Sequence, residues 1–214
     1  CEIVTIGSEL LLGQIVDTNT AYLARQLGQI GVATGFRTSV GDRLEEISQV
    51  IRAGTERCDM VITTGGLGPT LDDLTRQAVA RVAGVSLEFK QDLMDLIEKY
   101  FERAGYKMPQ NNRRQAYVPA GSRVIRNPVG TAPCFIAEAN GKPVICLPGV
   151  PRELSYLWDR EISAWIRERF GLSDQKVTYR VLKVVGLSES RVDRLIGDFM
   201  GVGKNPEVGL LASA

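Results

Sequence analysis

Apolar residues along this chain alternate between short continuous runs and helical spacings. The runs at residues 3–6, 32–40 and 60–63 are short and rich in β-branched side chains, which predicts strands. Between them, apolar positions three and four residues apart predict two helices, the first ended by Gly31 and the second opened by a capping box. The inward positions are Leu23, Leu27 and Ile30 in the first helix and Leu44, Ile47, Val50 and Ile51 in the second, and the capping box is formed by Asp42 and Glu45.

The same alternation continues to about residue 170. A glycine-rich turn follows the third strand, and helices and strands then succeed one another. The elements expected there are a helix ended by Gly84, an amphipathic helix over residues 88–104 that includes Phe89, strands around Val124 and Phe135 and at residues 143–147, and a helix from Pro151 to Phe170. Strands that alternate with helices predict the α/β class.

The last forty residues show a different pattern. A linker is expected at residues 171–174, a strand at 177–185, and a helix with Val192, Leu195, Ile196 and Phe199 on its inner face. Since 214 residues exceed what one small core needs, we predict a main domain over residues 1–171 and a small α+β appendage over 172–214. The appendage cannot bury much by itself, so we expect it to be part of a second domain or to dock on a partner.

Charge and composition narrow the function. The chain has 26 basic and 25 acidic residues, a net charge of +1, which favours neither nucleic acid nor an anionic membrane as partner. It has no histidine, which excludes Ser-His-Asp and Cys-His catalysis and His-ligated zinc. Four cysteines without a C-x-x-C pair predict no disulfide scaffold and favour the cytoplasm. Carboxylates, hydroxyls, backbone amides or a metal must carry any chemistry.

The turn from Gly65 to Asp73 is the first candidate site. Its glycines let backbone amides approach a phosphate, and the N-terminus of the following helix favours an anion, although no lysine is present to make a Walker loop. Asp72 and Asp73 would repel a phosphate unless a cation lay between them, and Mg²⁺ suits that ligand set. Two alternatives stay open: Thr70 and Asp73 as a capping box, and Glu9 as either a third carboxylate or a plain turn residue.

Four motifs resemble those of the competence/damage-inducible CinA family. They occupy residues 7–19, 65–75, 127–133 and 147–154, in family order over nearly the whole chain. The resemblance implies a three-layer αβα sandwich with a mostly parallel sheet, like the MoaB/Mog molybdopterin-binding domain. It also implies that the tail is a truncated KH-type domain, although the tail lacks the GxxG loop through which such modules bind RNA.

The resemblance further implies divalent-metal-dependent hydrolysis of a nucleotide pyrophosphate, with ADP-ribose giving AMP and ribose 5-phosphate. FAD is an open alternative substrate, Mg²⁺, Mn²⁺ or Co²⁺ is the expected cation, and a homodimer is the expected assembly. The catalytic and metal-ligating residues would be Asp73, Asp72 and Glu9, with Asp73 as the first choice for the metal. The substrate-binding residues would be Gly7, Ser8, Asn19, Gly65, Gly66, Leu67, Gly68, Thr70, Gly130, Thr131, Pro148 and Gly149.

Other readings of the same residues remain. The domain could instead bind molybdopterin or transfer an adenylyl group to it, or it could sense a nucleotide without turnover. Arg113 and Arg114 could clamp a phosphate or form a solvated surface pair. Cys134 stands where many relatives have glycine, so we expect its side chain to narrow the pocket. The general base of the hydrolysis is not assigned by the sequence.

Overall fold

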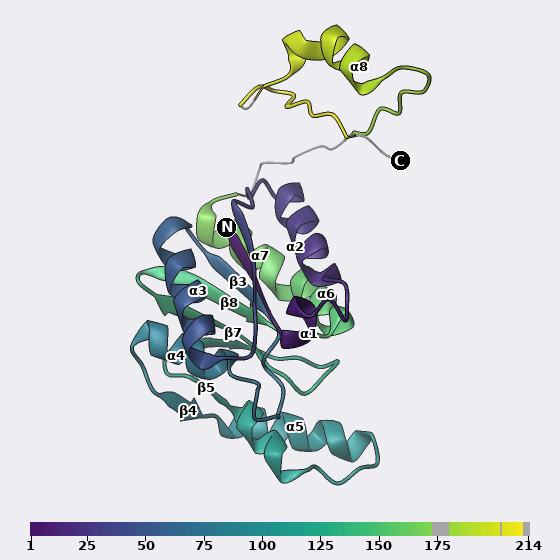
Figure 1. Cartoon of the computed structure of the whole chain (residues 1–214). Coiled ribbons are helices and arrows are strands. Elements are labelled where there is room, and N and C mark those ends of the chain that lie inside the picture. Colours follow the sequence, from purple (N-terminus) through teal and green to yellow (C-terminus); the bar gives the residue numbers. More distant parts are fainter. Residues whose placement is uncertain (173–179, 202, 212–214) are drawn as a thin grey trace. The chain divides into compact units, whose positions relative to one another are not determined.

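The computed structural model describes residues 1–172, 180–201 and 203–211. The chain divides into two compact units, Cys1–Val177 and Thr178–Ala214, which are described separately (Figure 1). The sequence places the corresponding boundary after residue 171.

A six-stranded sheet forms the centre of unit 1. Its order is β2-β1-β3-β8-β7-β6, in which β2, β1, β3 and β8 are parallel and β7 is antiparallel to both neighbours. The strands are β1 (Glu2–Ile6), β2 (Phe36–Val40), β3 (Val61–Thr64), β6 (Arg123–Ile125), β7 (Cys134–Ala139) and β8 (Lys142–Leu147). The mostly parallel α/β sheet expected from the alternating pattern is confirmed.

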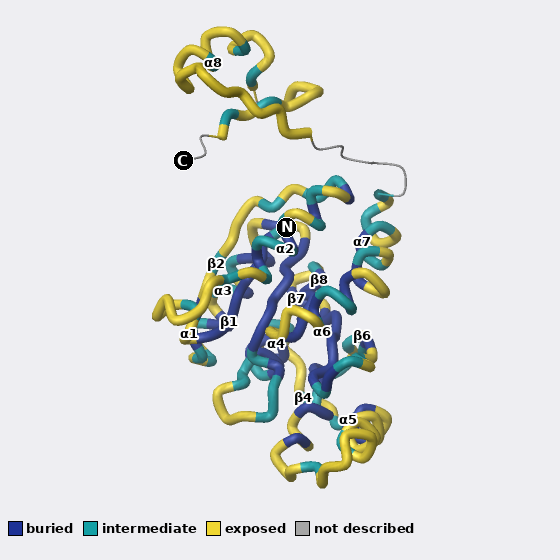
Figure 2. The backbone as a smooth tube through the Cα atoms, turned by 90° about the vertical axis from the view of Figure 1, so that its right-hand side faces the viewer, coloured by how far each residue is buried: buried dark blue, intermediate teal, exposed yellow. Residues whose placement is uncertain are grey.

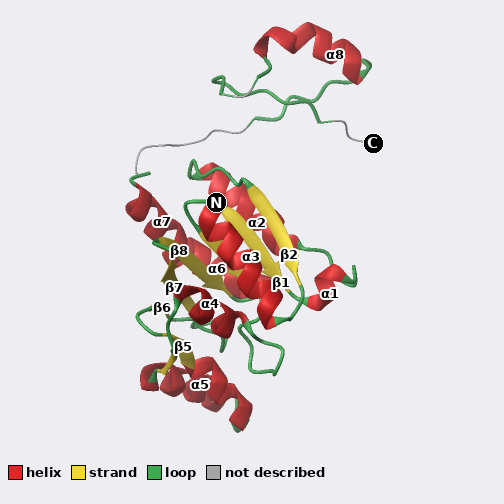
Figure 3. Cartoon of the chain, turned by 60° about the vertical axis from the view of Figure 1, so that its left-hand side comes forward, coloured by secondary structure: helices red, strands yellow, loops and turns green. Residues whose placement is uncertain are grey.

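Helices cover both faces of this sheet (Figure 3). Successive residues of a strand point to opposite faces, and Ile3 and Val4 accordingly belong to two different apolar clusters. One cluster joins the sheet to α3 (Leu44–Arg57), α4 (Thr75–Ala83) and α5 (Gln91–Arg103), and the other joins it to α2 (Thr18–Gln29), α6 (Pro151–Leu157), the π-helical turn η2 (Trp158–Ile162) and α7 (Ser163–Phe170). Unit 1 is therefore the three-layer αβα sandwich that the resemblance implies, with the buried residues concentrated along the sheet (Figure 2).

Several predicted boundaries were wrong. The second strand begins at Phe36 rather than at residue 32, because Val32 still bonds the carbonyl of Leu27 at the end of α2. The capping box does not form: the N-cap of α3 is Arg43, and the Asp42 carboxylate accepts a hydrogen bond from the Ser8 amide instead.

The long amphipathic helix also begins later than predicted. Phe89 lies in β4 (Leu87–Phe89), which pairs antiparallel with β5 (Tyr117–Pro119), and α5 starts only at Gln91. Between α5 and β5 lies a 3₁₀ segment, η1 (Gln110–Ala116). The guanidinium carbon of Arg113, in this segment, lies 4.4 Å from the centre of the Phe89 ring.

In unit 2, the described residues form one helix of more than one turn, α8 (Glu189–Ile196), followed by the 3₁₀ turn η3 (Gly197–Phe199). A helix lies where one was predicted, but the predicted inner face is not buried: Leu195 and Phe199 are 66% and 65% exposed, and Phe199 lies beyond the end of α8. The predicted strand is not found over residues 180–185, and its residues 177–179 lie outside the described part of the chain. Val208 to Leu211 belong to no helix or strand. Over the described residues, no helix has the length and apolar character needed to cross a bilayer.

Candidate functional site

The chain reverses its direction across the sheet at β1. From β1 it passes through α2 to β2 at the edge, and α3 then returns it to β3 on the other side of β1. The turns after β1 and β3 therefore diverge, and such a switch point is where open α/β sheets bind ligands. A cleft of about 500 Å³ lies here, lined by the turns that follow β1, β2, β3 and β8 and by α2 and α6.

The floor of the cleft contains two glycines, Gly65 and Gly66, at positions where a residue with a side chain would not fit. Gly65 has φ +101°, and a β-carbon there would lie 2.2 Å from the carbonyl oxygen of Ile6. Gly66 has φ +65°, and its β-carbon would lie 2.2 Å from the hydroxyl of Thr75. The turn after β3 is thus pressed against the end of β1, which brings its backbone to the surface of the cleft.

Asp73 holds the rim of this turn in shape. Its two carboxylate oxygens accept hydrogen bonds from the amides of Gly68 and Thr70, both at 2.8 Å. The Thr70 hydroxyl contacts the carboxylates of both Asp72 and Asp73. The hydrogen bond from Thr70 lowers the pKa of Asp72, which keeps that exposed carboxylate ionised.

The predicted helix N-terminus is not part of the cleft. Helix α4 starts at Thr75 with Leu74 as its N-cap, so Asp72 and Asp73 lie in the turn before the helix. Neither Leu74 nor Thr75 lines the cleft. The capping-box reading holds only in part: Asp73 accepts from the Thr70 amide, but no side chain caps α4.

A buried arginine supports the turn from below. Arg76 is 1% exposed and donates to the carbonyls of Leu67 at 2.6 Å and Gly68 at 2.9 Å. Burial lowers the pKa of Arg76 to about 10, while the negative charge of Asp73 opposes that shift, so the guanidinium stays protonated at neutral pH. Gln115 of η1 donates to the same Leu67 carbonyl at 3.3 Å.

The turns after β1 and β2 are tied together. The Ser8 amide donates to the Asp42 carboxylate at 2.8 Å, and the Asp42 amide donates to the Ser8 hydroxyl at 3.3 Å. Glu9 is exposed, and its carboxylate lies over Gly7, where a β-carbon would come within 2.5 Å of it. Glu9 and Asp42 both line the cleft.

Asn19, which also lines the cleft, joins three segments of the chain. Its amide nitrogen donates to the Thr64 hydroxyl at 3.1 Å and to the Gly149 carbonyl at 2.7 Å. The Thr64 hydroxyl in turn donates to the Pro148 carbonyl at 3.0 Å. The start of α2 and the ends of β3 and β8 are thereby fixed to one another.

Glu153, in the first turn of α6, is a cleft residue that the sequence did not single out as a site residue. Its half-buried carboxylate accepts a hydrogen bond from the Asn127 amide nitrogen at 2.6 Å and lies directly over Gly130. Burial raises the pKa of Glu153, against the lowering effects of the Asn127 hydrogen bond and the charge of Arg152. The signal that could have found Glu153 is its position directly after the turn that follows β8, which also lines the cleft.

Carboxylates supply all the charged side chains among the residues that line this cleft. They come from six residues, and the described lining contains neither lysine nor arginine. The six are Glu9, Asp17, Asp42, Asp72, Asp73 and Glu153. Arg113 and Arg114 do not line the cleft, so of the two alternatives left open by the sequence, the phosphate clamp is not formed there.

Most of the predicted site residues meet at this cleft. The three predicted catalytic carboxylates line it, and so do the predicted binding residues Gly7, Asn19, Gly65, Gly66, Leu67, Gly68, Thr70, Thr131, Pro148 and Gly149. Ser8 and Gly130 are not part of the lining: Ser8 bonds Asp42, and Gly130 lies against the Glu153 carboxylate.

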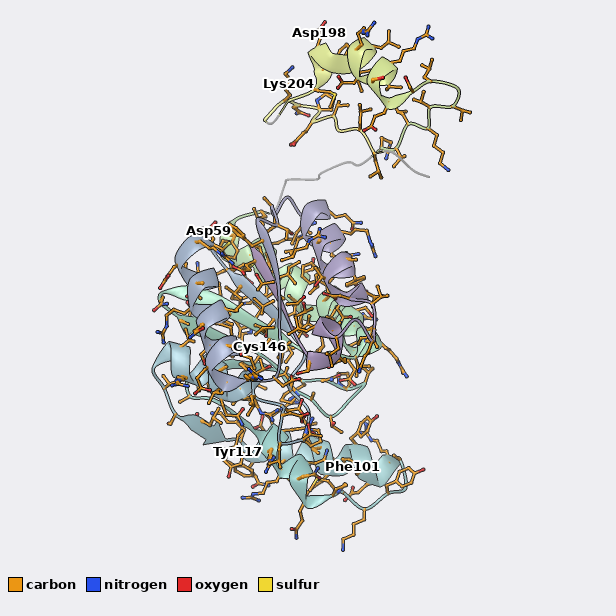
Figure 4. All side chains as sticks on the ribbon, viewed as in Figure 1. Asp59, Phe101, Tyr117, Cys146, Asp198 and Lys204 are labelled. Atoms are coloured by element: carbon orange, nitrogen blue, oxygen red, sulfur yellow. The ribbon has the colours of Figure 1, made fainter. Side chains whose placement is uncertain are left out.

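Cys134 does not narrow the cleft as predicted. Its side chain is 0% exposed, packs in the apolar cluster with Ile125 and Leu154, and does not line the cleft. Burial raises the pKa of the Cys134 thiol, and it raises that of Cys146, on β8 in the interior of unit 1, to about 12 (Figure 4). Neither thiol is suited to act as a nucleophile.

The four free thiols should therefore differ in reactivity. Cys1 is partly exposed, whereas Cys58, Cys134 and Cys146 are buried. We expect a water-soluble disulfide reagent to modify Cys1 rapidly in the native protein and all four cysteines after denaturation, as counted from thiolate release. If a second thiol of the native protein reacts rapidly, the measurement is repeated on Cys134→Ala. Disappearance of that second reaction in the variant would contradict the burial of Cys134.

Comparisons with known proteins place this geometry in a family. The family described as "Probable molybdopterin binding domain" matches residues 2–168. A protein of Caldicellulosiruptor bescii named as competence-damage inducible is 44% identical over 211 residues, which make up 99% of this chain and 51% of that relative. The structure of CinA from Thermoplasma acidophilum is 36% identical, with a TM-score of 0.70 over 76% of this chain and 95% of that one. The chain belongs to the CinA family.

This CinA-family chain spans about half the length of the curated relatives it matches; the one from Bacillus subtilis, 40% identical, is covered over 51% of its length. Its sandwich also resembles molybdopterin biosynthesis proteins. MoaB from Thermus thermophilus has a TM-score of 0.54 at 16% identity, over 83% of this chain and 98% of that one. Mog from Mycobacterium ulcerans has a TM-score of 0.53 at 18% identity, over 80% and 97%. These two likenesses concern the fold alone.

Proposed function

We propose that the cleft binds a nucleotide diphosphate together with a divalent cation and hydrolyses it, with ADP-ribose giving AMP and ribose 5-phosphate. The observation that carries the proposal is the set of six carboxylates around a glycine-built floor, without a basic side chain in the described lining. An anionic ligand gains a favourable environment here only when cations accompany it. The volume of about 500 Å³ is of the size that small-ligand sites have.

The residues present fit Mg²⁺ in one particular manner. In the described parts of the chain, no three acidic or thiol side chains converge on one point, so the protein has no ready-made cage for a metal. Mg²⁺ at phosphate sites commonly uses only one or two carboxylates together with phosphate oxygens and water. When bound, the cation would neutralise the diphosphate and polarise its phosphorus–oxygen bonds.

Asp72 is the first ligand that we assign to this cation. It is exposed on the cleft rim, and its carboxylate accepts a hydrogen bond from the Thr70 hydroxyl. Asp73 and Glu9 remain candidates beside it. Asp73 uses one lone pair of each oxygen to hold the Gly68 and Thr70 amides, so we assign it mainly to shaping the turn.

Incubation with ADP-ribose and Mg²⁺, Mn²⁺ or Co²⁺ in turn, with chromatography of the products, tests the proposal. We expect AMP and ribose 5-phosphate in equal amounts, with no release after a chelator is added. Absence of turnover with every cation would overturn hydrolysis. Persistent ADP-ribose binding in that case would favour a nucleotide-sensing role.

Asp72→Asn should weaken the dependence on the cation. The amide oxygen can still accept from the Thr70 hydroxyl, but the negative charge is lost. We expect the apparent cation affinity, measured by titrating turnover, to fall about 10- to 100-fold. Asp92→Asn, an exposed carboxylate at the start of α5, is the matched control and should change nothing. An unchanged cation titration for Asp72→Asn would remove this ligand assignment.

Molybdopterin is the second candidate ligand, favoured by the match of residues 2–168 to the molybdopterin-binding family. The carboxylates that line the cleft would repel a pterin diphosphate as they would ADP-ribose, so a cation would be needed for either ligand. The two activities differ in their products: hydrolysis releases free AMP, whereas adenylyl transfer leaves AMP attached to the pterin. A competition between ADP-ribose and molybdopterin for the cleft would measure which one binds more tightly.

We also propose, as expectations still open to test, that the protein acts in the cytoplasm and as a homodimer, without nucleic-acid or membrane partners. Sedimentation of the full chain measures the assembly.

A further inference from the structure

The six carboxylates of the cleft are not equivalent. Four of them already hold the protein together: Asp17 caps α2 through the Thr20 amide, Asp42 accepts from the Ser8 amide, and Asp72 and Asp73 bond the turn after β3. Glu9 is exposed. Glu153 combines two properties: it is half-buried, and its hydrogen bond comes from an uncharged side chain. Asp17, Asp42 and Asp73 are also partly buried but accept from backbone amides, and Asp72, bonded by the Thr70 hydroxyl, is exposed.

The loop at residues 127–133 fixes the orientation of Glu153. Asn127 accepts from the Val129 amide at 3.2 Å and donates to the Ala132 carbonyl at 2.8 Å, so the loop holds the side chain of Asn127 in place. Its amide nitrogen then donates to Oε2 of Glu153 at 2.6 Å. Among the described residues, no group donates a hydrogen bond to Oε1 of Glu153.

Gly130 provides the space for this carboxylate. A β-carbon at Gly130 would lie 2.1 Å from Cδ and Oε2 of Glu153 and 2.4 Å from Oε1. The backbone of Gly130 does not have a positive φ, so glycine is required here by the approach of the carboxylate and not by the backbone conformation.

We propose that Glu153 is the general base of the hydrolysis and that Asn127 is the residue that positions it. The inference rests on the proposed function. One oxygen of the carboxylate is held by Asn127, and the other is left to accept a proton from water in the cleft. This is the role that the sequence left unassigned, and it falls on a residue outside the predicted catalytic set.

The proposed step balances as follows. Glu153 takes one proton from a water molecule while the water oxygen forms a bond to one phosphorus of the diphosphate. The bond from that phosphorus to the bridging oxygen breaks, and the bridging oxygen leaves with the electron pair on the other phosphate. The proton on Glu153 then passes to solvent or to the departing phosphate, which regenerates the carboxylate.

The surroundings of Glu153 suit a base that works near neutrality. Burial raises its pKa, and a carboxylate with a raised pKa is a stronger proton acceptor. The loop beside it contributes only uncharged groups at Asn127, Gly130 and Thr131. The charged groups nearby are Arg152 on α6 and, elsewhere around the cleft, the carboxylates of Glu9, Asp17, Asp42, Asp72 and Asp73.

The decisive comparison is between the wild type and Glu153→Gln, measured as kcat, KM and the pH profile of kcat with ADP-ribose and the most effective cation. Loss of a general base commonly lowers the rate 10²- to 10⁴-fold, so we expect kcat to fall by about that factor with KM little changed. Wild-type kcat should fall at acidic pH as Glu153 is protonated, and this acidic limb should be absent from the variant. Glu161→Gln, an exposed glutamate further along the same helical segment, is the control and should behave as wild type.

Two variants test the positioning. Gly130→Ala should displace the Glu153 carboxylate, because the atoms in the way are the end of a flexible side chain. We expect kcat to fall while the urea midpoint of unfolding stays the same. Asn127→Ala should lower kcat and shift the acidic limb upward, since the hydrogen bond that lowers the pKa of Glu153 is lost.

The outcomes separate the role from the function. Full kcat with an unchanged acidic limb in Glu153→Gln would overturn the base assignment while leaving hydrolysis intact. A wild type that hydrolyses nothing with any cation would overturn the proposed function and the base assignment together. Loss of kcat with an altered fold in Glu153→Gln is checked by Gly130→Ala, whose unaltered activity would also overturn the assignment.

Discussion

Replacing Gly65 by alanine is expected to lower the free energy of unfolding of unit 1 by about 2–5 kcal/mol, combining left-handed backbone strain with overpacking. Both costs arise at one point. Gly65 has φ +101°, and the new methyl group would lie 2.2 Å from the Ile6 carbonyl oxygen, which is backbone and cannot move aside. Two hydrogen bonds also hold Gly65: its amide donates to the Leu147 carbonyl, and its carbonyl accepts from the Thr75 hydroxyl.

Urea unfolding followed by tryptophan fluorescence measures this loss. Trp158 and Trp165 are the two tryptophans of the chain and both lie in unit 1, so the signal reports that unit alone. The control is Gly28→Ala near the end of α2, where a β-carbon meets no atom within 4 Å, and we expect it to raise stability by up to about 1 kcal/mol. Equal midpoints for Gly65→Ala and wild type would show that the turn after β3 is not pressed against β1.

Arg76→Met is expected to have the second large effect, because it leaves two buried carbonyls without their donor. The acceptors are those of Leu67 and Gly68, and an unsatisfied buried acceptor costs about 1–3 kcal/mol. Gln115 still reaches Leu67, so the loss should be greatest at Gly68. We expect a lower urea midpoint together with weaker ADP-ribose binding by titration calorimetry, since Leu67 and Gly68 line the cleft.

Two further substitutions give this prediction its contrast. Arg76→Lys keeps a charge but cannot span both carbonyls as the planar guanidinium does, so it should rescue the loss only in part. Arg81→Met, on the exposed side of the same helix, removes a surface ion pair with Glu45 and should change little. Full rescue by lysine would show that the charge of Arg76 matters and its two-point geometry does not.

The sequence predicts the main sheet well where the signal is local. The three N-terminal strands each overlap an apolar run that predicted a strand. Gly84 ends α4 in the left-handed conformation expected of a helix-ending glycine. Phe89 was misplaced because its strand depends on Tyr117, which is 28 residues away and invisible to a local pattern. Residues 180–185 fail as a strand for a related reason: Leu182 and Val185 are 89% and 93% exposed, and no strand pairs with them in the described part of the chain.

The candidate site is predictable in its location more than in its details. The rule that ligands bind beyond the carboxyl ends of parallel strands brings together the turns at residues 7–9, 65–73 and 148–151, and the structure places all three around one cleft. Spacing does not reveal which carboxylates turn inward. Asp42 looked like a helix cap and bonds Ser8, and Glu153 looked like an ordinary residue of a first helical turn.

The hydrogen bonds of Asn19 have a consequence for how the protein folds. They join positions that are 45 and 130 residues away along the chain, and they can form only when β1, β3 and β8 are already aligned. A partly folded chain therefore offers no cleft, and a ligand discriminates fully between the native and unfolded ensembles. Its binding free energy is then added to the stability of the entire sandwich by mass action. Occupancy and cooperative folding are two aspects of one equilibrium in unit 1.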